Sequence, residues 1–453
     1  MTAPAARPRP ARRALDDLSL PVDAAAVEAA GAGDPEWLVA DRAAAFAAWQ
    51  TLPGETNQLY TPYIDLRAAQ LGETVFTSAS VATPGVATLD ADEDALIETD
   101  DAGTVRIALS DAARAAGVTV RPLRVELDAV RAWLDGGGSL PADDKFAQLT
   151  RALWSHGAVI DVPAGVRMER PIVVRWAVGT AGRALVTRTL VHLGAGADAA
   201  IVEGLVPTAA VSGATSQAFF AGTSEVMLDA GATLRMASLQ ELPDTVVAIQ
   251  HRRAEIGEAA TIQWALAQLG GRLVRSRVDN RLVGDRSSVE QVEIVFGSDA
   301  QVFDLTSYTT HIGRDTTGDL LSKGALLESA RASFKGLITI DKTAIGTDSF
   351  LGEFGMNLSK QARSVAIPSL EIDQPDCRRA MHSSSVGPVD EAQLFYLESR
   401  GIPEDEARKF IVLGFLEPVV ARVPLSAARD HLRELLEAKW TAGTDGVAGE
   451  AAA

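Results

Sequence analysis

Cysteine is nearly absent from this sequence, since Cys377 is the only one among 453 residues. A lone cysteine can form no disulfide within the chain, which agrees with a protein of a reducing compartment. No stretch approaches the ~20 consecutive apolar residues that a membrane-spanning helix requires. The first thirteen residues are rich in Ala, Arg and Pro but contain no apolar run, so we do not interpret them as a secretory signal peptide. Together these absences predict a cytoplasmic protein.

The common catalytic motifs are also missing. The sequence has no Gly-Lys dipeptide and therefore no phosphate-binding P-loop, and none of its six histidines is followed by Glu as in the HExxH zinc motif. It has no GxSxG nucleophile elbow either. Gly194, Gly196 and Ala199 fit a relaxed dinucleotide fingerprint, but strand-like residues follow them, whereas a phosphate-binding version must open a helix. We therefore interpret this segment as a turn and expect no catalytic residues.

Positive charge is in deficit. The chain has 42 Lys and Arg against 60 Asp and Glu, for a formal net charge of −18. A protein that coats nucleic acid needs clustered Lys and Arg to bind the phosphates, so this balance argues against that class while leaving a local basic patch open. The length suggests roughly three domains, or one long unit if the chain forms a solenoid.

The middle of the chain, from about residue 157 to 372, consists of short runs of Val, Ile, Thr and Leu separated by Gly, Asp and Ala. Four of the separating turns are alike and begin 35, 28 and 27 residues apart, and a related turn is predicted on another face. The four begin at Leu193, Leu228, Ile256 and Val283, and the related turn begins at Phe296. Weak repeats of this length are typical of a solenoid, and short strands without intervening helices indicate a β-solenoid. Because no strict hexapeptide repeat points to the left-handed form, we predict a right-handed parallel β-helix.

The predicted fold is therefore mainly β, with a β-helix core at 146–375 flanked by an N-terminal mixed α/β domain and a C-terminal helical domain. The N-terminal domain is expected at 34–145 and to be mostly helical, with a first helix that Asp34 caps and that ends at Leu52. Helices return within 376–440, where Gly401 is expected to end one of them. Residues 1–33 and 441–453 are of low complexity, and we expect them to be disordered.

An ordered series of residues near the C-terminus resembles the SufB/SufD family of iron–sulfur cluster assembly proteins. The most specific part comprises His382, Val386-Gly387, Asp390-Glu391, Gln393-Leu394-Phe395-Tyr396-Leu397, Ser399-Arg400-Gly401-Ile402 and Gly414-Phe415. Supporting matches are Phe334-Lys335-Gly336, Ile367-Pro368 with Leu370-Glu371-Ile372, and Asp144-Lys145-Phe146, so that the resemblance covers about residues 144–417. Upstream of Pro368, SufB carries a cysteine, but this chain has Ala362-Arg363-Ser364-Val365, so the sequence is most like SufD.

The resemblance implies a complex in which SufC is the ATPase and this chain is a scaffold subunit and not an enzyme. SufB and SufD would pair through their β-helices, and the C-terminal helices of each would contact a SufC-like ABC ATPase. A nascent cluster would lie at the interface between SufB and SufD, so the chain would hold no cofactor of its own and would share iron or a transient cluster with its partner. The residues expected to contact SufC are Leu394, Phe395, Tyr396, Arg400, Gly401 and Phe415.

His382 and Cys377 are the candidates for contact with iron or a cluster. His382 is either a surface residue at a domain junction or a metal ligand or proton carrier, and its match to the SufD histidine favours the second reading. Cys377 is the weaker candidate, because a lone cysteine is more often a small buried apolar residue. An iron–sulfur cluster takes four ligands, mostly thiolates, so a second chain or small thiols must supply the others. The SufD cysteine two residues before the histidine is Ala380 here.

Two alternative functions stay open. A SufB/SufD-like chain acting without a SufB partner would form a homodimeric scaffold. A β-helix enzyme acting on carbohydrate would need clustered carboxylates and a secretion signal. Its candidate carboxylates are Asp341, Asp348, Glu353 and Glu371, but their spread along the sequence favours turn and outer-face positions.

Overall fold

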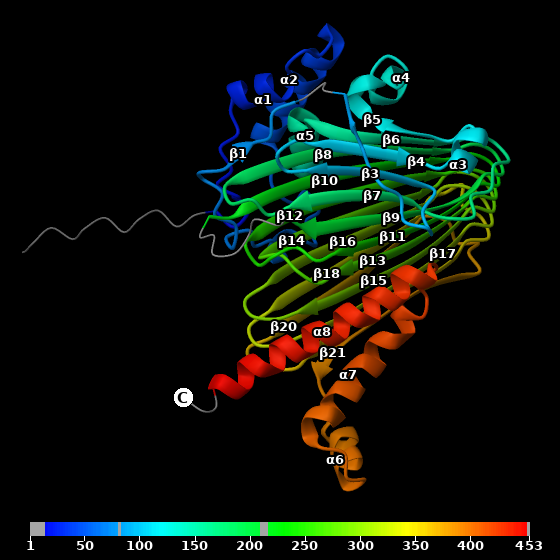
Figure 1. Ribbon diagram of the computed structural model, residues 1–453. Helices are drawn as coiled ribbons and strands as arrows, with labels where there is room; N and C mark the ends of the chain where they lie inside the picture. Colours follow the sequence, from blue (N-terminus) through cyan, green and yellow to red (C-terminus); the bar gives the residue numbers. More distant parts are fainter. Residues whose placement is uncertain (1–13, 80–82, 209–215, 451–453) are drawn as a thin grey trace, which may run out of the picture.

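Two β-sheets that face each other form the centre of the molecule, and helical segments cover their outer faces (Figure 1). The computed structural model describes residues 14–79, 83–208 and 216–450. The predicted disorder at 1–13 and 451–453 therefore lies outside the described residues. From β6 to β21 the chain alternates between the two sheets, so each strand pairs in parallel with the strand one coil earlier and one coil later. This arrangement is a parallel β-solenoid, which confirms the predicted fold class.

The strands of the two sheets are as follows. Sheet A contains, in spatial order, β20 (Arg363–Ile372), β18 (Arg331–Ile340), β16 (Val302–His311), β14 (Leu273–Leu282), β12 (Val246–Ile256), β10 (Ala218–Leu228), β8 (Arg183–Leu193), β6 (His156–Val162) and β5 (Thr119–Pro122), and β1 (Val75–Phe76) pairs with β8. Sheet B contains β2 (Gly85–Val86), β4 (Val105–Leu109), β3 (Ala95–Asp100), β7 (Ile172–Val178), β9 (Asp198–Pro207), β11 (Thr233–Gln240), β13 (Thr261–Gln268), β15 (Ser288–Gly297), β17 (Thr317–Leu326), β19 (Asp348–Asn357) and β21 (Arg379–Pro388).

The helices lie before and after the solenoid strands. The N-terminal region contains α1 (Ala24–Ala30), α2 (Glu36–Thr51), the short 3-10 helices η1 (Thr61–Tyr63), η2 (Leu123–Val125) and η3 (Asp135–Gly137), α3 (Asp111–Ala115), α4 (Arg131–Leu134) and α5 (Lys145–Leu153). The C-terminal region contains α6 (Glu391–Ser399), α7 (Glu404–Val420) and α8 (Ser426–Glu450). None of the helices in the described ranges is both long and apolar enough to cross a lipid bilayer.

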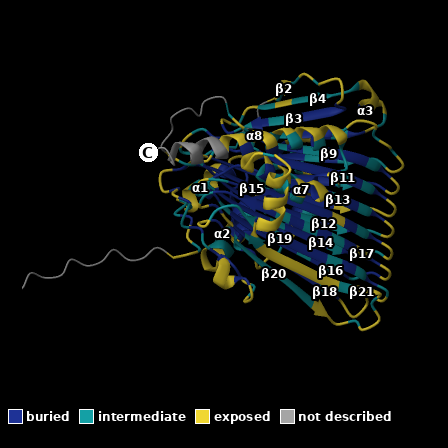
Figure 2. Cartoon of the chain, turned by 90° about the horizontal axis from the view of Figure 1, so that it is seen from below, coloured by how far each residue is buried: buried dark blue, intermediate teal, exposed yellow. Residues whose placement is uncertain are grey.

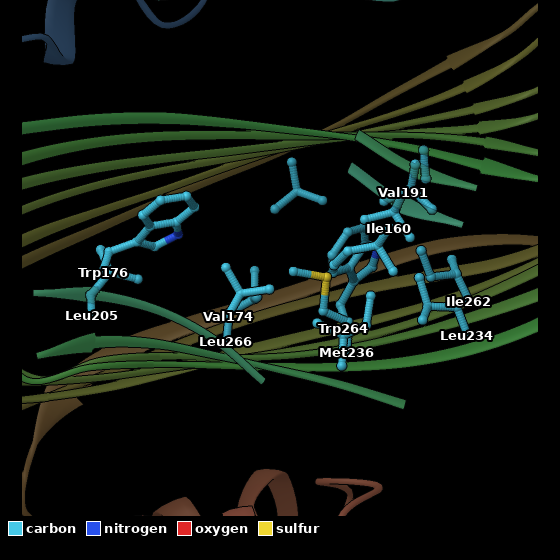
Figure 3. Packing of buried hydrophobic residues seen from close by; sticks show 14 of the residues in the cluster. Ile160, Val174, Trp176, Val191, Leu205, Leu234, Met236, Ile262, Trp264 and Leu266 are labelled. Carbon is cyan, nitrogen blue, oxygen red and sulfur yellow. The ribbon is translucent and has the colours of Figure 1, made fainter. Parts of the chain in front are cut away.

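The space between the sheets, here called the lumen, is filled by side chains that alternate along each strand. In β13, Ile262, Trp264 and Leu266 point into the lumen, where Figure 3 shows them packed with side chains of other strands. The intervening Ala265 and Ala267 face outward and are also buried, because the C-terminal helices cover them. Both faces of the strand are therefore apolar, which is why the sequence reads as short continuous runs.

The predicted turns all lie where strands end. The turns at Leu193, Leu228, Ile256 and Val283 follow β8, β10, β12 and β14 of sheet A, and the turn at Phe296 follows β15 of sheet B. These turns stack: Gly196 and Gly231 both have positive φ (68° and 70°), and the N–H of Gly196 donates to Ala230 of the next coil. Glycine adopts this left-handed conformation without steric cost, which explains the likeness of the turns. The first spacing is longer because residues 208–217 join β9 to β10.

Several predicted boundaries differ from the structure. Strands β3 and β4 extend sheet B and β5 extends sheet A, so the solenoid begins before residue 146 and the region 34–145 is not mostly helical. At the other end, β21 still belongs to sheet B, although the C-terminal helical domain was expected from 376. Helix α1 lies within 1–33, and α8 continues past 440, in two segments expected to be disordered. Asp34 does not cap α2, because its carboxylate accepts hydrogen bonds from Arg42 and Arg124.

Candidate functional site

The last coil of the solenoid leaves one end of both sheets open. Strand β20 ends sheet A and β21 ends sheet B, so each has a single neighbouring strand. Most residues of these two strands are half-buried or exposed, whereas the preceding strands are mostly buried (Figure 2). Exposed apolar side chains here are Ile372, Met381 and Val386. A strand edge with free N–H and C=O groups and apolar side chains is a template for pairing with another chain.

His382 lies on β21, three residues after the strand begins, and not at the junction with the helices where the sequence placed it. Its register partner in β19 is Leu351, which points into the lumen and is 1% exposed. Because side chains at paired positions point to the same face, His382 continues the row of lumen residues. No further coil covers it, so its imidazole is exposed at the open end.

Cys377 lies in the loop between β20 and β21. Its free thiol is half-buried beside a small apolar cluster that includes Ile338, Ile340 and Leu351. In the ranges that the structure describes, no group of three or more His, Cys, Asp or Glu side chains is arranged to hold a metal ion. His382 and Cys377 thus lie in one coil without forming a ligand set within this chain.

The carboxylates considered for a carbohydrate enzyme do not share a face. Asp341 is an exposed turn residue that accepts a hydrogen bond from the N–H of Thr343, and Asp348 pairs with the exposed Arg379. Glu371 is the next-to-last residue of β20, whereas Glu353 is 2% exposed and points into the lumen. Burial raises the pKa of Glu353 to about 8, and its carboxylate accepts a hydrogen bond from the N–H of Ile367 in the edge strand β20.

The sequence did not predict a row of buried glutamates inside the solenoid. Glu203, Glu293 and Glu353 occupy one row of lumen positions in β9, β15 and β19. Ser238 and Leu266 lie between Glu203 and Glu293 in this row, and Ser322 lies between Glu293 and Glu353. Glu203 accepts from Arg252 at 2.5 Å, while burial raises the pKa of Glu293 to about 7. The alternation along β15 could have predicted that Val289, Glu293 and Val295 point inward. That Glu293 aligns with the other two glutamates follows only from the pairing register of the strands.

The C-terminal helices present a second exposed surface. Helix α6 packs against α7 and stands away from the sheets in Figure 1. Phe395 and Tyr396 are 71% and 56% exposed, and the Arg400 guanidinium lies 5.2 Å from the Tyr396 ring. Gly401 has a φ of 86° and ends the turn after α6, as predicted. Phe410 on α7 is 58% exposed as well, and it is absent from the predicted set.

Two other predicted docking residues have structural contacts. Leu394 is 6% exposed. Phe415 is half-buried against sheet B, where its backbone carbonyl accepts from Lys323 Nζ at 2.7 Å and its ring lies 4.5 Å from the same ammonium. Phe415 therefore helps to attach α7 to the solenoid, and Leu394 is buried. The exposed aromatic side chains of α6 and α7, together called the aromatic surface, are therefore Phe395, Tyr396 and Phe410.

Comparison with known proteins gives a consistent result. Residues 176–415, more than half of the chain, match the family described as SUF system FeS cluster assembly, SufBD core domain. Iron–sulfur cluster assembly SufBD family proteins of Staphylococcus epidermidis, Staphylococcus haemolyticus and Staphylococcus aureus are each 29% identical over 287 residues. The match covers 63% of this chain and 61% of the length of these relatives. The parallel solenoid and the sequence match together show that the chain belongs to the SufBD family of iron–sulfur cluster assembly proteins.

Proposed function

We propose that the chain is a SufD-like subunit of a SufB–SufC–SufD-type scaffold on which iron–sulfur clusters are built. The observation that carries the proposal is the open solenoid end, where edge strands β20 and β21 present backbone groups, apolar side chains and the exposed His382 together. A SufB-like subunit would pair with these strands and supply the thiolates that this chain lacks. The chain would then act by position and not as an enzyme, in the cytoplasm.

The assignment to the SufD type rests on what is absent near the open end. Upstream of Pro368, where SufB carries a cysteine, this chain has Ala362-Arg363-Ser364-Val365. Cys377 is the only thiol that the chain brings, and one thiolate leaves most positions of a cluster unfilled. Iron or a transient cluster would therefore be shared across the interface, with His382 as this chain's ligand or proton carrier and Cys377 as a weaker second ligand.

The aromatic surface on α6 and α7 is the proposed contact for a SufC-like ABC ATPase. Phe395, Tyr396 and Phe410 are large apolar side chains in water, and aromatic residues are enriched at the energetic centres of interfaces. Arg400, beside Tyr396, would add a charged contact at the edge of this surface. Hydrolysis in the ATPase would move these helices, and α7 contacts β15 and β17 directly.

A homodimer is the alternative that the same open end supports. Edge strands pair with any suitable strand, including those of a second copy related by twofold symmetry. The two arrangements differ in whether the partner brings cysteines.

The test is co-expression with candidate SufB-like and SufC-like chains, followed by affinity purification. Val386→Lys places a charge on β21 and should abolish pairing with SufB, because inward charges on an edge strand prevent strand addition. Val86→Lys, on the exposed strand β2 at the opposite end of sheet B, is the matched control and should leave pairing intact.

Phe395→Ala with Phe410→Ala should release SufC while retaining SufB, and Val39→Ala on α2 is the control for an exposed apolar residue. If Val386→Lys left the SufB-containing complex unchanged, the open end would not be the interface. If the chain purified only as a dimer of itself, sensitive to Val386→Lys, the homodimer would replace the proposal.

A further inference from the structure

A cleft rich in arginine lies between the N-terminal region and the strand starts of sheet A. It has a volume of about 600 Å³ and is lined on one side by the segment of Tyr63, Asp65 and Arg67. The other side is formed by residues at or near the beginnings of β14, β16, β18 and β20, including Arg272, Arg331 and Arg363. Four arginines therefore line one hollow in a chain whose net charge is −18.

Two of these arginines are held side by side by the strand register. Arg331 in β18 is the register partner of Arg363 in β20, and both side chains are exposed. Neighbouring strands are ~4.8 Å apart, and like charges directly opposite each other destabilise a sheet. Such a pair is favourable when an anion lies between the guanidinium groups.

Two of the cleft arginines donate to backbone carbonyls, which carry no net charge. Arg272 donates to the carbonyl of Ala300 at 2.7 Å, and Arg363 donates to the carbonyl of Lys360 at 2.6 Å. These acceptors orient the guanidinium groups without neutralising them.

The two carboxylates in the cleft, Asp65 and Asp304, both have cationic partners. Asp65 forms a two-bond pair with Arg67 at 2.7 and 2.8 Å, and this pair lowers the pKa of Asp65. Asp304 is buried between Arg275, at 2.5 Å, and Lys335. Arg331 also contributes to lowering the pKa of Asp65, so this carboxylate offsets part of its charge. The cleft still has a local positive charge, because four arginines line it against two aspartates.

We propose that this cleft binds a small molecule bearing two or more phosphate groups. A guanidinium presents two parallel N–H donors that match the oxygens of a phosphate, and a set of three suits a diphosphate. The volume lies in the range of small-ligand sites, and half-exposed Tyr63 with Val302 and Val365 supplies apolar contact for the rest of such a molecule. Arg363 and Val365 lie on the edge strand β20, which the proposed SufB-like partner would contact, but binding to the chain alone does not depend on the proposed function.

Calorimetric titration of the full chain with inorganic pyrophosphate, and separately with ADP, tests the proposal. We expect one site per chain, with binding of pyrophosphate stronger than that of inorganic phosphate. Arg331→Ala and Arg363→Ala should each weaken binding at least ~10-fold, as expected for loss of charged hydrogen bonds. Arg363→Lys keeps the charge but loses the paired donors, so its affinity should lie between those of wild type and Arg363→Ala.

Arg314→Ala is the matched control, because Arg314 is an exposed arginine in the turn between β16 and β17, outside the cleft. It should bind pyrophosphate like wild type. Thermal unfolding of each variant checks that the fold is retained. The proposal is overturned if wild type binds neither pyrophosphate nor ADP at millimolar concentration, or if Arg331→Ala and Arg314→Ala weaken binding equally. Binding of an oligoglutamate peptide in the absence of pyrophosphate binding would likewise overturn it, in favour of an acidic protein segment.

Discussion

The outer faces of the two sheets are covered in chemically different ways. The N-terminal region covers sheet A, and helices α7 and α8 cover sheet B (Figure 1). Both contacts bury apolar side chains, but the contact on sheet A also buries several ion pairs, whereas on sheet B Lys323 and Lys439 donate to backbone carbonyls. The paired charges on sheet A fix the position of the N-terminal region. The apolar area buried on sheet B stabilises the attachment of the helices.

On sheet A, buried ion pairs join residues far apart in sequence. Glu55 pairs with Arg275 of β14 at 2.9 Å, and both side chains are 3% exposed. Asp144, which caps α5, pairs with Arg277 at 2.7 Å. Glu225 of β10 accepts from the N–H of Ser139 at 2.8 Å. Each pair is satisfied in one arrangement only, because any displacement leaves a buried charge without its partner.

On sheet B, the contact is mainly apolar. Val412, Leu416 and Leu432 of α7 and α8 pack on outward residues of β11, β13 and β15 such as Ala265 and Ile294. Charged contacts occur at the periphery, for example between Arg422 and Asp319, whose side chains are 29% and 42% exposed. The helices that carry the proposed ATPase contact are thus attached by burial of apolar area, which is not directional.

The largest expected effect is on the charged contact. Arg275→Ala leaves Glu55 and Asp304 buried without their guanidinium, so it should lower the free energy of unfolding by ~3–5 kcal/mol. Arg106→Ala, which breaks an exposed pair with Glu98, should change it by less than ~1 kcal/mol. Urea denaturation measures both. Equal effects of the two substitutions would show that the buried ion pairs on sheet A contribute no more to stability than an exposed pair.

The apolar contact should respond to loss of volume. Leu416→Ala removes a fully buried side chain from the face of α7 that packs on sheet B, and should cost ~2–4 kcal/mol. Phe410→Ala on the same helix, where the ring is 58% exposed, should leave stability within ~0.5 kcal/mol of wild type. A larger loss for Phe410→Ala than for Leu416→Ala would show that α7 packs through its other face.

A buried glutamate in the lumen should make the free energy of unfolding depend on pH. Burial raises the pKa of Glu293 from its ordinary value of 4.5 to about 7, so the native state binds this proton more tightly than the unfolded state. Stability relative to Glu293→Gln should therefore fall as the pH rises from 4.5 to about 7 and stay constant above. At pH 8 the variant should be more stable by on the order of 1–3 kcal/mol.

Glu290→Gln, an exposed position on the same strand, controls for the substitution itself. Unfolding of both variants and wild type is compared at pH 5 and pH 8. A difference between Glu293→Gln and wild type that does not change between these pH values would contradict a buried, protonated Glu293.

The smallest effect is expected in the turns that connect the sheets. Ala259 has a φ of 53° at the position where earlier coils have Gly196 and Gly231. Ala259→Gly should relieve steric strain and stabilise the protein by up to ~1 kcal/mol after the entropy of glycine is counted. Ala230→Gly, one residue before a left-handed position, should not stabilise. Destabilisation by Ala259→Gly, measured by thermal unfolding, would show that the side chain has contacts that outweigh the strain.

The solenoid could be predicted because its signals are local. Short Val-rich runs and turns that resemble each other follow from the stacking of coils, and Gly196 and Gly231 mark the same position in two of them. The C-terminal helices were predicted from comparable local signals, such as Gly401.

The buried pairs were not predictable, because Glu55 and Arg275 are 220 residues apart and either charge alone reads as a surface residue. The strand around His382 was missed for a related reason. Three serines follow the histidine, and its extended conformation comes from pairing with β19 and not from intrinsic preference. The sequence made His382 a candidate, whereas its place at the open end required the structure.

The most direct test of the central claim is the iron and acid-labile sulfide content of the co-purified complex with SufB-like and SufC-like partners, compared between wild type and His382→Ala. His192→Ala, on the outer face of sheet A beside Asp161 and Asp229, serves as the control. Because His382 is exposed, its loss should leave the fold and the complex intact while iron and sulfide fall together, with His192→Ala unchanged. An intact His382→Ala complex with wild-type iron and sulfide would contradict a role of this residue at the site where clusters are built.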